Sequence, residues 1–222
     1  MDIQETGSKT TINYQTGQEE TIKSITTQDL IFNYPHASKT AGFAYRILND
    51  KTNGTFVEIG SSHWRDGNHT YMLEKEFGWR GVGIDIQDHF VEEYNKNRES
   101  ECVLGDALSF NWDEYLEWNN FPKTIDFLQI DVDDIIPHSN LLALTNVPFG
   151  RYTFNVISVE HLGHFDKRYK TDRDTQRHIL YSYGYLLVAS LFTEDWWIHS
   201  SLDIAPSTYD RLSSDAWSRV LY

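Results

Sequence analysis

An apolar run that stops at a glycine turn, followed by a second apolar run that ends on an acid, is the feature that most constrains this chain. The first run is FVEIG at residues 56–60 and the second is GVGID at residues 81–85, with a helix-length segment between them. A glycine after a strand lets the backbone approach a ligand closely, and an acid at the end of the next strand can bind a ribose diol. The pattern predicts half of a nucleotide-binding α/β unit, with Gly60 and Asp85 at a nucleoside site.

Size and charge narrow the classes of partner. The chain has 222 residues, enough for one domain with a sizeable core. It carries 33 Asp and Glu against 19 Lys and Arg, a formal net charge of -14. Such a surface repels phosphate backbones, so we expect no nucleic-acid partner. It fits a neutral or cationic small-molecule acceptor, or simply good solubility.

Cysteine usage and hydropathy bear on the compartment. Cys102 is the only cysteine, which leaves no internal disulfide and no thiolate-rich zinc cluster and favours a reducing compartment. The opening residues MDIQE lack the basic and apolar regions of a signal peptide. No apolar stretch approaches the roughly 20 residues that a bilayer requires. We therefore expect a soluble, cytoplasmic protein without a membrane partner; the sequence carries no signal for its oligomeric state.

The order of elements predicts a parallel sheet. Residues 1–26 are polar and predict an N-terminal arm or a poorly ordered, flexible lead-in, while 27–222 are predicted to form a single domain. Strands are predicted at 55–59, 80–85, 101–104, 125–130 and 154–159, and helices at 38–49, 67–77, 88–97, 111–118, 137–143 and 172–183. Strands that alternate with helices indicate a parallel sheet with helices on both faces. Two last apolar runs, at 186–192 and 196–199, predict an antiparallel hairpin.

Four segments resemble one known family. They are FVEIG at 56–60, DGNHTYMLE at 66–74, GWRGVGID at 78–85 and IDFLQIDVD at 125–133. In order and spacing they are similar to FkbM-type S-adenosylmethionine-dependent methyltransferases, over about residues 55–200. The resemblance implies a class I methyltransferase, Rossmann-like fold: a seven-stranded, mostly parallel sheet closed by the C-terminal hairpin.

Two segments depart from the family pattern. SSH at 61–63 stands where the family prefers Ala-Asn and a small residue, next to the cofactor. DVDD at 131–134 stands where the family usually has Asp-Val-Glu-Gly, close to the reacting groups.

The resemblance implies that S-adenosylmethionine is the cofactor and that residues at the strand ends bind it. These residues are Glu58, Gly60, Ser61, Asp85, Ile86, Asp106, Ala107 and Asp131.

Each of these positions also has a purely structural interpretation. Gly60 fits an ordinary turn glycine, and Asp85 fits a helix N-cap instead of a ribose ligand. Asp106 fits a turn residue instead of a partner for the adenine amino group, with Ile86 beside the ring. Glu58 faces the cofactor's amino group or orders the glycine turn, or it is a solvated strand end.

Three residues are candidates for catalysis and for a metal. Asp131 follows the fourth strand, and Glu160 and His161 end the fifth, so their side chains are predicted to converge where open α/β sheets place ligands. Carboxylates with one His suit Mg²⁺ or Mn²⁺. Alternatively, His161 or Asp131 acts without metal as the base that removes a hydroxyl proton. The structural alternative is a polar strand end. Trp196 and Trp197 either line a sugar site or pack in the core.

The sequence thus predicts an S-adenosylmethionine-dependent O-methyltransferase. The resemblance implies a hydroxyl of a sugar or glycan as acceptor. Two alternatives remain: a nicotinamide-dependent oxidoreductase, which usually has a fuller Gly-x-Gly-x-x-Gly signature, and a methyltransferase fold that binds without catalysis.

Overall fold

The computed structural model describes residues 9–12, 19–22, 39–133, 136–163, 166–191 and 193–204. Near the N-terminus, β1 (Lys9–Ile12) and β2 (Glu19–Ile22) pair antiparallel as a separate two-stranded sheet. Both strands fall within the predicted arm. The boundary predicted at residue 26 lies outside the described residues, so the division into arm and domain stays a prediction.

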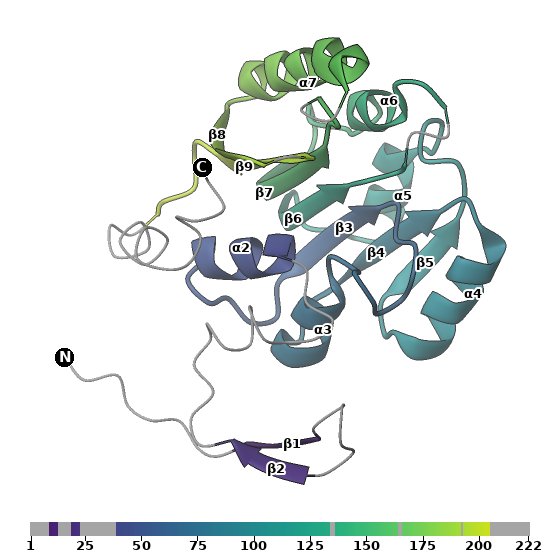
Figure 1. The fold of residues 1–222 in the computed structure, drawn as a ribbon, viewed down its shortest axis with the longest axis vertical. Coiled ribbons are helices and arrows are strands. Elements are labelled where there is room, and N and C mark those ends of the chain that lie inside the picture. Colours follow the sequence, from purple (N-terminus) through teal and green to yellow (C-terminus); the bar gives the residue numbers. More distant parts are fainter. Residues whose placement is uncertain are drawn as a thin grey trace.

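A seven-stranded sheet forms the centre of the molecule (Figure 1). Its strands are β3 (Thr55–Ile59), β4 (Arg80–Asp85), β5 (Glu101–Leu104), β6 (Thr124–Ile130), β7 (Thr153–Glu160), β8 (Tyr185–Ser190) and β9 (Glu194–His199). They lie in the order β5-β4-β3-β6-β7-β9-β8. Strands β3 to β7 are parallel, and β9 is antiparallel to both β7 and β8. The predicted sheet and its C-terminal antiparallel hairpin are confirmed, with β9 inserted between β7 and the edge strand β8.

Helices cover both faces of the sheet because its strands alternate apolar side chains to both sides. On one face lie α2 (Lys39–Ile47), α3 (Tyr71–Phe77) and α4 (Asp88–Asn97). On the other lie α5 (Trp112–Trp118), α6 (Ser139–Thr145) and α7 (Lys170–Ser182), the last preceded by the short 3-10 helix η1 (Lys167–Tyr169). Neighbouring residues of one strand therefore belong to different cores: Phe56 packs with the first group and Val57 with the second.

Helix α3 begins four residues later than the sequence predicts. The side chain of Asn68 accepts hydrogen bonds from the backbone N–H groups of Thr70 and Tyr71, at 3.0 and 2.8 Å. This local bond holds the preceding residues in a loop and moves the helix start to Tyr71. Gly78 ends the helix as predicted, in the left-handed conformation with φ 69°.

Both tryptophans of β9 belong to the core. Trp196 and Trp197 are 1% and 0% exposed, and Trp196 stacks on Phe43 of α2 with ring centroids 4.7 Å apart. Core packing, not a sugar-lining surface, is thus their place in the fold. No helix in the described part of the chain is long and apolar enough to cross a membrane.

Candidate functional site

A cavity of about 370 Å³ lies at the carboxyl ends of β3, β4, β5 and β6. Six of the eight predicted cofactor residues line it: Gly60, Asp85, Ile86, Asp106, Ala107 and Asp131. Its wall also includes Ser62, Ile84, Gln87, Phe90, Gly105, Leu108, Val132, Asp133, Ile136 and Ser139. Glu58 and Ser61 are not part of the lining.

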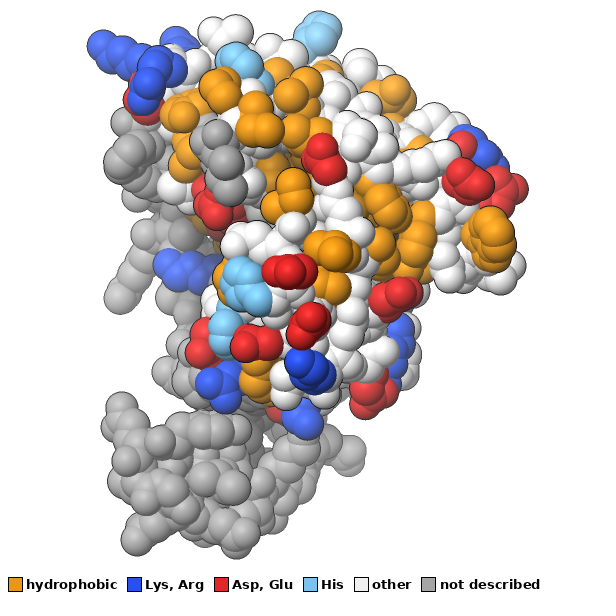
Figure 2. Space-filling view, turned by 90° about the vertical axis from the view of Figure 1, so that its right-hand side faces the viewer, with side chains coloured by type: hydrophobic (Ala, Val, Ile, Leu, Met, Phe, Trp, Pro, Cys, Tyr) orange, Lys and Arg blue, Asp and Glu red, His pale blue; other side chains and the backbone are white. Residues whose placement is uncertain are grey.

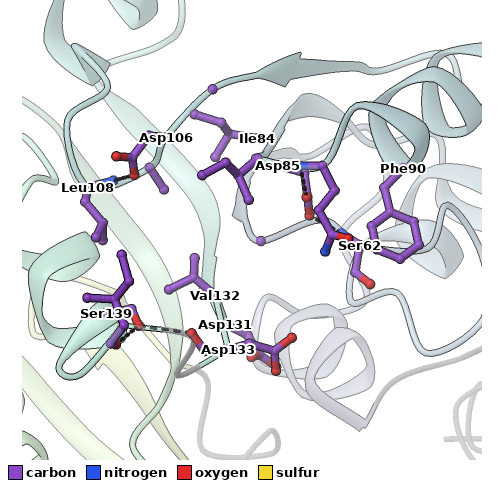
Figure 3. Close-up of a pocket in the computed structure, with 16 residues that line it drawn as sticks. Ser62, Ile84, Asp85, Phe90, Asp106, Leu108, Asp131, Val132, Asp133 and Ser139 are labelled. Carbon is purple, nitrogen blue, oxygen red and sulfur yellow. Dashed lines mark hydrogen bonds between the residues drawn. The ribbon is translucent and has the colours of Figure 1, made fainter.

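Asp85, the last residue of β4, is fixed by two hydrogen bonds from the backbone (Figure 3). Its Oδ2 accepts a hydrogen bond from the backbone N–H of Ser62 and its Oδ1 one from that of Gln87, both at 2.8 Å. The residue is 8% exposed, and the N-cap of α4 is Gln87. Asp85 is therefore not a helix cap, and each fixed oxygen retains lone-pair capacity for a hydroxyl in the cavity.

Only glycine fits at position 60, because the backbone that follows strand β6 lies directly against it. The φ of Gly60 is 85°, and a Cβ at this position would lie 1.8 Å from the backbone oxygen of Asp131. The ends of β3 and β6 meet there, since Asp131 N–H bonds Ile59 O at 2.9 Å. The glycine brings Asp131 to the cavity wall as well as leaving room for a ligand.

Asp106 forms the predicted turn and also lines the cavity, while its contact with an adenine amino group stays a prediction. Its Oδ1 accepts the N–H of Leu108 at 2.9 Å, which closes a turn, and the residue still lines the cavity. Ala107 and Leu108 follow it, and Ile86 and Phe90 line the cavity from the β4 side. The wall thus combines apolar surface with isolated carboxylates, which suits a planar ring that has polar groups at its edge.

Glu58 lies behind the cavity and orders the loop after β3. It is fully buried and accepts hydrogen bonds from Asn68 Nδ2 at 3.1 Å, His69 N at 3.2 Å and Thr70 Oγ1 at 2.9 Å. Burial raises the pKa of Glu58, against the opposing charges of Arg98 and His69. It is therefore no solvated strand end.

Ser61 is also directed away from the cavity. Its hydroxyl donates to Glu58 O at 3.4 Å and occupies the space above Gly83, where a Cβ would come within 2.2 Å of it. Ser61 and Glu58 thus support the turn at Gly60 from the side opposite the cavity.

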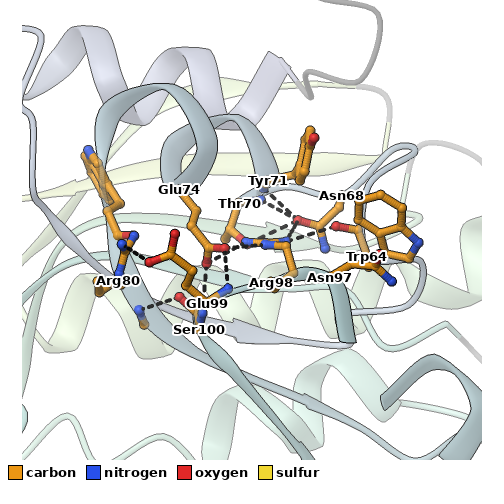
Figure 4. Close-up of polar contacts among 12 residues, drawn as sticks. Trp64, Asn68, Thr70, Tyr71, Glu74, Arg80, Asn97, Arg98, Glu99 and Ser100 are labelled. Carbon is orange, nitrogen blue, oxygen red and sulfur yellow. Dashed lines mark hydrogen bonds and ion pairs between the residues drawn. The ribbon is translucent and has the colours of Figure 1, made fainter. Parts of the chain in front are cut away.

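Arg98, which follows the last residue of α4, stabilises the same loop through hydrogen bonds (Figure 4). Its guanidinium donates to Glu74 Oε1, Asn68 Oδ1 and Thr70 Oγ1, each at 3.0 Å, and to Trp64 O at 3.1 Å. Its side chain is 1% exposed and that of Glu74 is 7% exposed. The charges and hydrogen bonds of Arg98 and its neighbours outweigh burial and lower the pKa of Glu74.

Asp131 and Glu160 form a hydrogen-bonded carboxyl pair at the ends of β6 and β7. Burial, then the charge of Asp131, raises the pKa of Glu160 to about 8. Burial acts in the same direction on Asp131, but His69 and Glu160 outweigh it, so that its pKa is lowered. Asn140 Nδ2 donates to Glu160 Oε2 at 2.9 Å and fixes the pair from α6.

A third carboxyl lies on the same face of the sheet. Glu194 of β9 stands opposite Glu160 in the strand register. Its Oε2 accepts from Ser158 Oγ at 2.6 Å and from Thr40 Oγ1 at 3.2 Å. The side of the site beyond Asp131 is therefore acidic.

His161 does not join the carboxyl pair, which corrects the predicted convergence with Asp131 and Glu160. Its Nε2 lies 3.3 Å from Asp195 Oδ1, its side chain is fully buried, and Arg177 binds the other oxygen of Asp195 at 2.6 Å. Successive residues along an extended strand point to opposite faces, so Glu160 and His161 diverge.

The position of His161 also bears on the predicted metal site of Asp131, Glu160 and His161. Among the residues that the structure describes, no three His, Cys, Asp or Glu side chains are arranged to hold a metal ion. A set of Asp131, Glu160 and His161 is thus not assembled, because its histidine lies on the other face.

The sequence reasoning missed His69, Asn140 and Arg98. The Asn68-His69-Thr70 segment was part of the family pattern, and a polar triplet before a helix is a capping signal. That signal indicates a loop before α3, but it does not show that the His69 side chain reaches the end of β6.

The surface on the cavity side carries no continuous basic patch among its described residues. In Figure 2, acidic side chains are interspersed with apolar ones. Ile86 and Ile136, which line the cavity, are 63% and 56% exposed and contribute to this apolar surface.

Comparison with solved structures shows the fold. A candidate rRNA methylase from Clostridium thermocellum superposes with TM-score 0.50 at 15% identity, over 72% of this chain and 95% of that chain. A TDP-rhamnose 3′-O-methyltransferase of calicheamicin biosynthesis gives TM-score 0.49 and 16% identity over 80% and 88% of the two chains. Fibrillarin from Aeropyrum pernix, solved with bound S-adenosylmethionine, gives 0.48 and 12% over 88% and 84%.

The chain thus has the Rossmann-like fold of class I S-adenosylmethionine-dependent methyltransferases. No family model matches it, and a search of curated proteins found no relative. The similarity to the FkbM type therefore stays a prediction from the sequence.

Proposed function

We propose that this chain is an S-adenosylmethionine-dependent O-methyltransferase. The observation that carries the proposal is Asp85, held by two backbone amides at the wall of a cavity at the carboxyl ends of the parallel strands. In open α/β sheets this edge is where ligands bind, and an acid at this strand end suits a ribose diol.

The residues of the cavity fit the cofactor. Its volume of about 370 Å³ falls within the range of roughly 300–1,000 Å³ typical of small-molecule sites. Asp85 would hold the ribose hydroxyls, and Asp106 the adenine amino group. Ile86 and Phe90 would flank the ring, and the methionine end would lie toward Gly60 and Asp131.

The cofactor supplies an activated methyl group bound to a sulfonium. Transfer of this methyl group to an acceptor hydroxyl would form a carbon–oxygen bond in place of the carbon–sulfur bond, whose electron pair would stay on sulfur. The hydroxyl proton must then leave, and Glu160 is the group suited to take it. Its raised pKa lies near working pH, as an efficient general base requires. That carboxyl contacts Asn140 and Asp131, and Asp131 in turn lines the cavity.

The acceptor proposed here is a hydroxyl of a sugar or glycan. This part rests on the resemblance to the FkbM type, which supplies the acceptor class. The net charge of -14 supports a neutral acceptor over a phosphorylated one.

Calorimetry with S-adenosylhomocysteine tests the cofactor. We expect the parent protein to bind it and Asp85→Ala to weaken binding at least tenfold, about 1.4 kcal/mol or more. The matched control is Asp88→Ala, because the Asp88 side chain lies nearby on α4 and is 82% exposed; its affinity should equal the parent's. A parent protein that binds NADH and not S-adenosylhomocysteine would establish the oxidoreductase instead.

A panel of glycans and simple sugars, with mass spectrometry of the products, tests the reaction. We expect one acceptor class to gain 14 Da per transfer, which is the mass of a CH₂ group. The rate should be indifferent to a chelator, because the predicted metal set is not assembled. Cofactor binding without a methylated product from any acceptor would favour a binding domain.

A further inference from the structure

His69 connects the loop that supports the turn at Gly60 to the carboxyl pair. Its backbone N–H donates to buried Glu58 at 3.2 Å, which fixes the residue in the loop before α3. Its side chain turns the other way, and its Nε2 lies 3.7 Å from Asp131 Oδ2. Asp131 itself lines the cavity and bonds Glu160.

The imidazole is not needed to hold the loop. The Nδ1 atom is buried and has no hydrogen-bond partner among the described residues. The loop is held instead by Asn68, Thr70 and Arg98, through contacts that do not involve the ring of His69. The ring's ion pair is the one with Asp131.

The charges around the ring favour its protonated form. Burial lowers the pKa of His69, but Asp131, Glu194 and Glu58 together outweigh it, so the pKa is raised. Asp131 lies between this cation and Glu160, and Asp133 adds a further negative charge near Glu160. A protonated His69 therefore lies beside Asp131, and its positive charge reduces the repulsion that opposes ionisation of the neighbouring Glu160.

We propose that His69 is a positioning residue of the reacting centre: its imidazolium, bound to Asp131, balances the charge of that carboxylate and so allows Glu160 to ionise and take the acceptor's proton. The role of Glu160 in this inference rests on the proposed function. The ion pair itself is a property of the free protein, so it can be tested without a cofactor or an acceptor.

The first test is a carboxyl-carbon NMR titration of the full chain labelled at Glu and Asp. His69→Gln places a neutral amide beside Asp131 in place of the charged ring. We expect the pKa of Glu160 to rise by about one unit above its value in the parent, because Asp131 is no longer compensated. His178→Asn is the matched control, since His178 is exposed on α7, and it should leave the titration of Glu160 unchanged.

Asp131→Asn gives the reciprocal measurement, and it carries the test if His69→Gln does not fold. With the carboxylate removed, the pKa of His69 should fall toward or below 6.5. A Glu160 titration that is unmoved in His69→Gln, or a His69 pKa that remains raised in Asp131→Asn, would overturn the inference.

A rate measurement separates the failure of this inference from that of the proposed function. If the parent methylates an acceptor, the limb of its log kcat profile that rises with pH should move up by about one unit in His69→Gln, while the affinity for S-adenosylhomocysteine changes less than about threefold. A parent that does not bind S-adenosylhomocysteine rejects the methyltransferase, whereas a pH profile in His69→Gln that superimposes on the parent's rejects the role of His69.

Discussion

The two halves of the sheet's carboxyl edge are built differently. At the ends of β4 and β5, each acid stands alone and is fixed by a backbone amide two residues further on: Asp85 by Gln87 and Asp106 by Leu108. At the ends of β6 and β7, the acids contact each other, and they are held by side chains from distant segments, His69 and Asn140 among them. The first arrangement suits a site that binds, and the second one that moves a proton.

The electrostatics follow from this difference. Burial and the neighbouring charge of Asp131 raise the pKa of Glu160 to about 8, and the pKa of Asp131 is lowered. Pairs of titratable groups whose environments push their pKa values apart are typical of acid–base sites. We therefore expect substitutions in the second half to change the rate, and substitutions in the first half to change affinity.

The sharpest test of this division is Glu160→Gln. The amide keeps the size and the contact with Asn140 but cannot accept the acceptor's proton, so we expect kcat to fall about a thousandfold, within the roughly 10²–10⁴ that a general base contributes. Calorimetry should show cofactor affinity within about threefold of the parent's. Glu92→Gln, exposed on α4, is the control. A kcat within tenfold of the parent's would remove Glu160 from the reaction.

Arg98→Met tests whether the buried hydrogen-bond network of Arg98, which lies under the half of the edge formed by β4 and β5 (the binding half), determines stability. Removing Arg98 leaves Glu74 buried without its partner, so we expect the free energy of unfolding to fall by about 3–5 kcal/mol in denaturant titrations. In Arg151→Met, a surface arginine that pairs with Asp113 and Glu117 is removed instead, and no measurable change is expected. A small loss in Arg98→Met, below about 1 kcal/mol, would mean that the loop is held by other contacts.

The same contrast explains what could be read from the sequence. Asp85 and Asp106 can be located from the sequence, because an acid directly after a predicted parallel strand lies at the carboxyl edge of the sheet whatever its partners are. His69 was missed because its partner Asp131 is distant in the chain, and only the folded sheet brings them together. Glu160 and His161 were wrongly placed on one site. They are adjacent in sequence, but strand alternation directs them to opposite faces.

The pH dependence of the rate offers a smaller effect. The form of Glu160 that accepts a proton is the carboxylate, and its pKa is raised to about 8. The rate should therefore rise with pH and level off above about 8, and at pH 7 it should be about a tenth of the plateau. Asp131 has a lowered pKa and stays ionised over this range, so the affinity for S-adenosylhomocysteine should change little. A rate that is flat between pH 6 and 9 would contradict this assignment.

The smallest expected effect is that of Asp106→Asn. The side-chain oxygen can still accept the N–H of Leu108, so the turn after β5 should persist, and only the negative charge that would face the adenine amino group in the proposed complex is lost. We expect the affinity for S-adenosylhomocysteine to fall about threefold, roughly 0.7 kcal/mol, with kcat unchanged. Asp106→Ala also removes the turn bond, so its affinity should fall further than that of Asp106→Asn. If the two variants lose affinity equally, the carboxylate acts on the ligand directly and the turn is incidental; if kcat falls in either, the division of the edge into a binding half and a reacting half does not hold.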